Sequence, residues 1–354
     1  MHPGKELNRD FLRAVKLLMV AASTTVLLMA AVLLWAGGVW RNIVPARPPQ
    51  QVAATKVSAP VSQPEFWQAP DITLVSDRAR IAEISYGREL IVQTSKYLGP
   101  QGTVSKISNG MNCQNCHLDA GTKNFGNNYG AVASTYPKLR ARSGSVESIE
   151  KRVNDCFERS LNGKALDSSS REMRAIVSYI QWLGSDVEKG KVPNGSGLAK
   201  MEVLDRAADP QQGKLLYDTQ CVVCHGKNGE GLKLPDGSGY QFPPLWGEHS
   251  YNHGAGLYRI SNFAQFIRTN MPLGATYEKP ILSEEQAWDI AAYVNSMPRP
   301  RKDLSKDWPD IAKKPFDHPF GPYIDPFGEK QHKYGPFQPI KEFYAAKKNA
   351  QSRN

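Results

Sequence analysis

CQNCH at residues 113–117 and CVVCH at residues 221–225 are two copies of the pattern C-x-x-C-H. In this pattern the two thiols form thioethers with the vinyl groups of a porphyrin, and the adjacent histidine ligates the iron. A zinc site would need further ligands, and no histidine lies between the two motifs. A redox dithiol would need a βαβ context, which the sequence lacks. The motifs therefore predict two covalently bound haem c groups.

The motifs assign distinct roles to their residues. The expected attachment residues are four cysteines, Cys113, Cys116, Cys221 and Cys224. His117 and His225 are the expected axial ligands on one face of each iron. Because haem c is attached outside the cytoplasm, we expect both haem domains in the periplasm or its equivalent.

The two motifs lie in a divergent internal repeat. GRELI at 87–91 and GKLLY at 213–217 each resemble the helix that opens a cytochrome c domain. Capping boxes at 169–172 and 283–286 each precede apolar residues at helical spacing, which predicts a closing amphipathic helix. The expected fold is all-α, with two cytochrome c-type haem domains in tandem.

The chain divides into five predicted segments. They are an N-terminal segment with a transmembrane helix (1–42), a flexible linker (43–71), two cytochrome c domains (72–190 and 200–300) and an irregular tail that wraps the domains (301–354). The linker is rich in Pro, Gln, Ala and Val without periodicity, as in an extended tether. In the tail, His318 and His332 are expected to pack or to form hydrogen bonds instead of ligating iron.

An uncharged run of 24 residues occupies positions 17–40. About 20 apolar residues cross a bilayer, whereas the apolar stretch of a cleaved signal peptide usually has about 7–15 residues. No clean small-x-small site follows the run. We therefore expect a single-pass anchor in the inner membrane, with a cleaved signal peptide as the alternative.

The composition is ordinary for a globular protein, with 40% hydrophobic and 22% charged residues among 354. This apolar content excludes intrinsic disorder of the whole chain. The formal net charge of +10 invites a nucleic-acid-binding interpretation. However, four haem propionates would lower it to about +6, and no nucleic-acid-binding motif is present. We expect no nucleic-acid partner.

The second haem has four candidate sixth ligands: Met271, Met297, His249 and His253. Met271 lies in TNMPLG, between an expected helix at 263–268 and the closing helix, where a small cytochrome c has its distal methionine. Met297 lies beyond the closing helix. We therefore predict Met271 as the ligand, which helps to set the potential of the iron.

The first domain has no spare histidine, and its Met173 falls on the apolar stripe of a helix. This leaves Cys156, the fifth cysteine. On a helix, Cys156 would share one face with Val146, Ile149 and Val153, so its thiol would point inward. Two interpretations are open. Cys156 is a buried structural cysteine, or it is a thiolate ligand, since an unused thiol is a liability in an oxidising compartment.

Four long stretches resemble one protein family. They are CQNCHLDAGTKNFG (113–126), YPKLRARSGSVESIEKRVNDCFERSLNGKAL (136–166), TNMPLG (269–274) and HPFGPYIDPFGEKQHKYGPFQPI (318–340). The sequence after residue 75 is thereby similar to the dihaem thiosulfate dehydrogenases. The resemblance implies an oxidoreductase that couples two thiosulfate ions to tetrathionate and releases two electrons, a reaction that is reversible in principle.

The resemblance also implies roles for individual residues. It assigns His117 and Cys156 to an active-site haem, and His225 and Met271 to an electron-transfer haem. It assigns anion binding to Arg142, Arg152 and Ser160, and more weakly to Lys164. Asn270 stands where some members have a lysine that can ligate iron, which argues against a ligand switch here. Many members are soluble, so the N-terminal anchor is a departure.

Basic residues near Cys156 agree with an anion site. They are Arg140, Arg142, Lys151, Arg152 and Arg159. Joining two thiosulfate dianions requires their repulsion to be overcome, and a guanidinium suits two-point recognition of an oxyanion. In the implied cycle, Cys156 leaves the iron, bonds the sulfane sulfur of one thiosulfate, and returns when a second thiosulfate attacks. Some of the basic residues are expected to face solvent or to pair with haem propionates.

Two other functions fit parts of the sequence. A membrane-tethered dihaem electron carrier would explain the haems and the anchor but not Cys156 with its arginines. A haem thiosulfotransferase of the sulfur-oxidation system would need a carrier-protein partner. For the favoured function, the expected partners are thiosulfate, tetrathionate and a periplasmic or membrane-bound electron acceptor, such as a cytochrome c or an oxidase.

Overall fold

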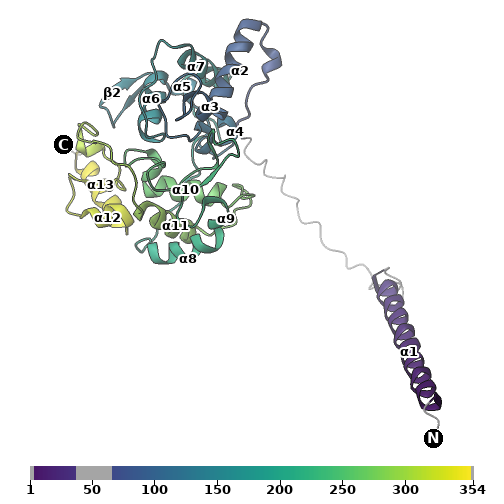
Figure 1. The fold of residues 1–354 in the computed structure, drawn as a ribbon. Helices are drawn as coiled ribbons and strands as arrows, with labels where there is room; N and C mark the ends of the chain where they lie inside the picture. Colours follow the sequence, from purple (N-terminus) through teal and green to yellow (C-terminus); the bar gives the residue numbers. More distant parts are fainter. Residues whose placement is uncertain (1–3, 37–65, 352–354) are drawn as a thin grey trace, which may run out of the picture. The chain divides into compact units, whose positions relative to one another are not determined.

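The computed structural model describes residues 4–36 and 66–351. The chain forms two units, residues 1–62 and 63–354, which are treated separately. Figure 1 shows the described helix of the first unit and the helical body of the second.

The described helix of the first unit is α1 (Gly4–Ala36). Its span Val15–Leu33 is long and apolar enough to cross a membrane. The hydroxyl groups of Ser23, Thr24 and Thr25 donate hydrogen bonds to carbonyl oxygens one turn earlier, so no hydroxyl among these three needs water. The span overlaps the anchor predicted at 17–40, of which residues 37–40 lie outside the described residues. A signal sequence shares these properties.

The first domain of the second unit is built around two helices that pack closely, α2 (Arg78–Val92) and α7 (Arg171–Leu183). A Cβ atom at Gly87 would lie 2.0 Å from the carbonyl oxygen of Ala175. The first residue of the predicted GRELI motif is therefore a glycine because two backbones meet there.

The second domain repeats this arrangement with α8 (Pro210–Gln220) and α11 (Glu284–Ser296). A Cβ atom at Gly213 would lie 1.9 Å from the carbonyl oxygen of Asp289. The two halves of the predicted internal repeat thus share one helix-packing contact. The expected pair of mostly helical cytochrome c-type domains is confirmed.

The closing helices begin near the predicted capping boxes. Ser283 and Gln286 form the predicted box at α11. At α7 the N-cap is Ser170, which accepts a hydrogen bond from the backbone of Met173. The predicted box at 169–172 is therefore wrong: the N-cap lies one residue later, and Met173 at the third helical position has no side-chain acceptor to complete a box.

Short elements fill the space between the paired helices. In the first domain they are α3 (Thr94–Leu98), η3 (Cys113–Asn115), α4 (Leu118–Gly121), α5 (Val132–Thr135), β1 (Lys138–Arg140), β2 (Ser145–Glu147) and α6 (Ile149–Arg159). In the second domain they are α9 (Val222–His225), β3 (Leu232–Lys233), β4 (Tyr240–Phe242), η4 (Gly256–Tyr258) and α10 (Ile260–Asn270). The strands form two antiparallel pairs, β1 with β2 and β3 with β4.

The predicted face of the Cys156 helix needs a correction. Ser148 caps the N-terminus of α6, so the helix begins at Ile149. Val146 lies in β2 and is 69% exposed. The β1–β2 hairpin ends before the helix, so Val146 cannot share the inward face of α6.

The folded body starts inside the segment predicted as a linker at 43–71. Phe66 packs edge-on against Phe125. Trp67 is buried in the core of the first domain and donates its backbone N–H to the carbonyl of Asn194. The described residues 66–71 therefore belong to the folded unit, and residues 43–65 lie outside the described residues.

The tail after residue 300 contacts both domains but is not wholly irregular. It contains η5 (Ile311–Lys313), α12 (Glu329–Tyr334) and α13 (Gln338–Gln351), drawn in yellow in Figure 1. Phe337 and Ile340 are buried in the core of the second domain. The proline and aromatic content hid these helices, whose apolar residues pack against the second domain.

The tail histidines form hydrogen bonds. His318 Nδ1 lies 3.2 Å from the carbonyl oxygen of Phe320. His332 lies between the carbonyl oxygen of Phe316 and the carboxylate of Asp325, at 2.7 and 3.0 Å.

Candidate active site

The first motif holds its histidine in a fixed orientation. His117 Nδ1 lies 2.6 Å from the carbonyl oxygen of Asn127, and the ring stacks on Tyr129 with the centroids 4.5 Å apart. A hydrogen bond to a carbonyl places the proton on Nδ1 and leaves the lone pair of Nε2 for a ligand. This fixed orientation is the one expected of a histidine that ligates iron through Nε2.

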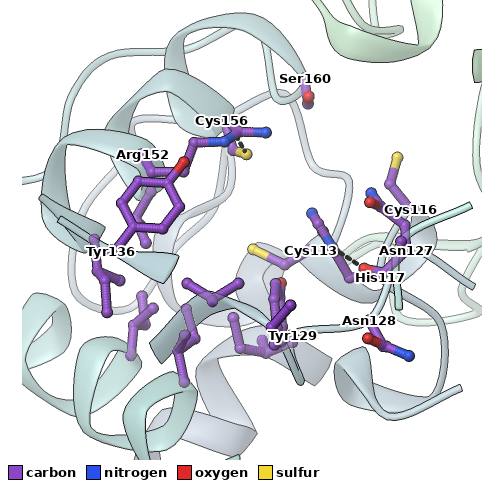
Figure 2. A pocket seen from close by; sticks show the side chains of 18 of the residues that line it. Cys113, Cys116, His117, Asn127, Asn128, Tyr129, Tyr136, Arg152, Cys156 and Ser160 are labelled. Atoms are coloured by element: carbon purple, nitrogen blue, oxygen red, sulfur yellow. Dashed lines mark hydrogen bonds between the residues drawn. The ribbon is translucent and has the colours of Figure 1, made fainter. Parts of the chain in front are cut away.

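His117 borders a cavity of about 340 Å³, here called the first cavity. Figure 2 shows Cys113 and Cys116 near His117, with Cys156 and Arg152 farther across the view. Apolar side chains complete the wall, among them Ile91, Ile149, Val153, Phe157, Leu161, Ile176 and Ile180. Two thiols, an imidazole and apolar walls are the donor set and surroundings that a c-type haem requires.

The thiols of the first cavity differ in acidity. Burial raises the pKa of Cys113 and of Cys116 to about 12. Burial would also raise the pKa of Cys156, but the charge of Arg152 opposes this, and the pKa lies lowered at about 7. The Arg152 guanidinium lies 3.2 Å from Cys156 Sγ. Cys156 is therefore the thiol with thiolate character, which iron ligation and nucleophilic attack both need.

A second cavity of about 320 Å³, here called the basic cavity, adjoins the first. The two cavities share four lining residues, Lys138, Arg140, Arg152 and Ser160. The basic cavity adds Arg142, Arg159 and Arg259 to its lining, with Asp155 as a lining acid. The structure thus brings the predicted residues Arg142, Arg152 and Ser160 to one cavity.

Two other predicted basic residues do not line either cavity. Lys151 pairs with Asp155 on α6, and half of its side chain is exposed. Lys164 is exposed and donates its backbone N–H to Ile107. In contrast, Arg142 is largely buried, and burial together with repulsion from Arg159 lowers its pKa to about 10.

The second motif lines a separate cavity of about 320 Å³, here called the second cavity. Its walls include Cys221, Cys224, His225 and Met271. His225 Nδ1 lies 2.9 Å from the carbonyl oxygen of Pro243, which repeats the arrangement of the first histidine. Met271 ends α10 and faces this cavity with apolar neighbours.

The other candidate ligands of the second haem do not line its cavity. Met297 packs against the core of the second domain, and His253 stacks on Tyr258. His249 is likewise absent from the lining. Asn270 is buried and donates a hydrogen bond to the carbonyl of Phe125, so this position ties the two domains together.

Cys116 belongs to the lining of both the first and the second cavity. The neighbouring residues Met111, Gln114 and Asn115 also line the second cavity. The loop of the first motif is therefore the partition between the two cysteine-lined cavities.

Sequence reasoning missed several residues of this region. Thr94 accepts a hydrogen bond from the backbone of Cys113 and lies 3.2 Å from its sulfur. Asp307 forms two hydrogen bonds of 2.8 Å with the Arg159 guanidinium. Asp307 and its neighbour Trp308 are 148 or more positions beyond Arg159, so no local pattern could have linked them.

In residues 4–36 and 66–351, no group of three His, Cys, Asp or Glu side chains is arranged to hold a metal ion.

Comparisons with known proteins identify the domains. Residues 103–188 match the family described as SoxA/TsdA, cytochrome c domain, and residues 210–298 match the family described as Cytochrome c. These matches cover both C-x-x-C-H motifs and identify the chain as a c-type cytochrome.

Several similar proteins carry one name. The thiosulfate dehydrogenase of Psychrobacter arcticus is 39% identical over 68% of this chain and 71% of its own length. That of Allochromatium vinosum is 37% identical over 66% and 87%. A solved structure of thiosulfate dehydrogenase (TsdBA) from Marichromatium purpuratum matches with a TM-score of 0.61 and 30% identity, over 67% of this chain and 50% of that one. The chain therefore belongs to the thiosulfate dehydrogenase family.

Proposed function

We propose that this protein oxidises thiosulfate to tetrathionate at Cys156 and passes two electrons through two covalently bound haem c groups. The observation that carries the proposal is the thiolate-prone Cys156, which lines a cavity opposite His117 and next to the basic cavity. Membership of the thiosulfate dehydrogenase family supports the substrate.

The residues of each cavity would hold one haem. In the first cavity, Cys113 and Cys116 would attach it, and His117 and Cys156 would ligate its iron. In the second cavity the corresponding residues are Cys221, Cys224, His225 and Met271. When bound, each haem supplies one-electron oxidation, so two haems match the two electrons of the reaction.

The sulfur chemistry is balanced in two steps. In the first, the Cys156 thiolate and the sulfane sulfur of one thiosulfate form a disulfide, Cys156–S–S–SO₃⁻, and two electrons leave. In the second, another thiosulfate attacks the sulfane sulfur of this adduct. A new S–S bond gives tetrathionate, and the electron pair of the broken bond returns to Cys156 as thiolate.

The basic residues have separate tasks. Arg152, 3.2 Å from Cys156 Sγ, stabilises the thiolate before attack and after release. Arg142 and Ser160 are placed to hold sulfonate oxygens beside it. Because thiosulfate is a dianion, these positive charges offset the repulsion that would otherwise keep two such ions apart.

The second cavity would hold the group that relays electrons outward. Cys116 lines both cysteine-lined cavities, which supports electron transfer between groups held on either side of it. The acceptor would be a periplasmic or membrane-bound cytochrome or oxidase. The apolar span Val15–Leu33 would anchor the protein in the inner membrane, with the haem domains in the periplasm.

The test is a measurement of stoichiometry. Purified oxidised holoprotein receives thiosulfate and an artificial electron acceptor, and both acceptor reduction and tetrathionate are quantified. The proposal expects two electrons per tetrathionate at a catalytic rate. Electron uptake without tetrathionate would contradict the proposal, and transfer of the sulfur to a protein thiol would favour the thiosulfotransferase alternative.

A further inference from the structure

The basic cavity extends from the first domain to residues outside it. Its far wall comes from Arg259, which is the N-cap of α10, Asn262 of α10 and Trp308 of the tail. Cys156 itself lines the first cavity but not this one. The region therefore contains two adjoining spaces with different walls.

Carboxylates hold two guanidinium groups of the basic cavity in place. Arg159 is bound at two points by Asp307. Arg259 is bound by Asp317, which is fully buried. A guanidinium fixed in this way presents its remaining N–H groups without losing further side-chain entropy when an anion binds.

Two buried donors of the lining residues lack a partner. Neither Trp308 Nε1 nor Arg159 Nε has a hydrogen-bond acceptor in the described structure. Arg142 lines the same cavity, with its guanidinium 5.7 Å from the Trp308 ring and its Nε 4.0 Å from Asp307. An oxyanion in the cavity is an acceptor close to all three side chains, and buried donors are rarely left without one.

We propose that the basic cavity is a second thiosulfate subsite, which holds the attacking dianion while the first thiosulfate is bound to Cys156. The inference rests on the proposed Cys156 chemistry. The ion waits among Arg142, Trp308 and Asn262, and the shared residues Arg152 and Ser160 form the passage to the adduct. Attack breaks the Cys156–sulfane bond, forms the sulfane–sulfane bond, and returns the electron pair to Cys156.

The attack of the second thiosulfate on the Cys156 adduct, here called discharge, can be measured without electron transfer. Tetrathionate added to the holoprotein converts Cys156 to the adduct and releases one thiosulfate, which is the reverse of the second step. After free tetrathionate is removed, thiosulfate is added, and loss of the adduct is followed by the mass of the Cys156 peptide. The rate is compared between variants that start from equal adduct fractions.

Asn262→Asp is the principal variant, because it adds a negative charge to the far wall with little change in size. At low thiosulfate, we expect discharge to slow by at least about tenfold, since like charges oppose binding, and to recover at high thiosulfate. Asn262→Ala loses the same 3.0 Å hydrogen bond to the Gly256 carbonyl without added charge, and we expect a smaller effect. Asn349→Asp, on the exposed α13, controls for overall charge and should discharge at the native rate.

Trp308→Phe is an independent second variant, which keeps an aromatic ring and removes the unpartnered N–H together with the five-membered ring that carries it. We expect slower discharge at low thiosulfate. If Asn262→Asp and Trp308→Phe both discharge like the native protein, or if Asn349→Asp is slowed as much as Asn262→Asp, the second subsite is wrong while the proposed function stands. If the native protein forms no adduct, both proposals fall.

Discussion

The two cysteine-lined cavities of this protein share the arrangement of the C-x-x-C-H motif and differ in a second sulfur-bearing residue, Cys156 in the first and Met271 in the second. Both histidines direct Nδ1 to a backbone carbonyl, of Asn127 in one case and Pro243 in the other. The first cavity then presents a thiol whose pKa is lowered beside an arginine, whereas the second presents the thioether of Met271 among apolar side chains. Under the proposed function, one scaffold would provide a reaction site and a relay site, and the difference would lie in Cys156 with its arginine in one cavity and Met271 in the other.

Replacement of Cys156 should produce the largest effect, because it removes the residue that most distinguishes the first cavity from the second. In Cys156→Gly we expect thiosulfate oxidation to fall by at least about a thousandfold, since the nucleophile is lost. Both haems should remain attached, because the thioether cysteines are untouched. Activity assays with a haem-content measurement check this, and a near-native rate would remove Cys156 from the mechanism.

Removal of the charge beside Cys156 should have the next largest effect. In Arg152→Gln, loss of a hydrogen bond to a charged group costs about 1.5–3 kcal/mol, which is roughly ten- to a hundredfold in kcat/KM. Arg140→Gln is the matched control, since Arg140 lines the same cavities but does not bind the sulfur. Equal losses in the two variants would mean that general positive charge, not the Arg152 contact, is what matters.

Met271→Ala should impair the relay without impairing the sulfur chemistry. Methionine ligation raises the potential of haem iron, so we expect the potential of the second haem to fall. A fall of about 60 mV changes a one-electron equilibrium tenfold, and steady-state turnover should decrease to a similar degree. Redox titration and the Cys156 adduct assay check this together. Loss of adduct formation would show that the two cavities are not functionally separate.

The packing glycines should show where the two domains are alike. In Gly87→Ala and Gly213→Ala, the new Cβ atom meets a backbone carbonyl at about 2 Å, so the helices must separate. We expect about 1–3 kcal/mol of destabilisation in each variant, as for other overpacked contacts. Thermal unfolding followed by circular dichroism measures this, with Gly256→Ala as a control at an open position without a positive φ.

The smallest effect is expected from removal of the first unit. A protein that begins at residue 63 keeps the whole second unit, which contains the first, basic and second cavities. We expect an unchanged rate with a soluble artificial acceptor and loss of the protein from the membrane fraction. A large loss of rate with that acceptor would show that the N-terminal unit has a role in the reaction itself.

Local patterns predicted much of this molecule. The two motifs, Gly87 and Gly213, and the cap at Ser283 act within a few residues of where they lie, so the sequence displays them directly. The contacts of the tail with the basic cavity could not be predicted from local patterns. Asp307 binds Arg159, and Trp308 lies against Arg142, only because the folded tail returns to the first domain. The placement of Val146 was wrong for a related reason. Helical spacing put it on the face of Cys156, but Val146 lies in strand β2, which the spacing did not reveal.

The central claim is that Cys156 forms a covalent bond with thiosulfate during turnover. The most direct measurement is to quench the native holoprotein with acid while it reduces an artificial acceptor in the presence of thiosulfate, and to weigh the peptide that contains Cys156. We predict a fraction of this peptide with one thiosulfate group attached, which disappears once the acceptor is exhausted while thiosulfate remains, because the adduct is then consumed but no longer formed. Tetrathionate formed at two electrons each, with Cys156 unmodified throughout, would contradict it.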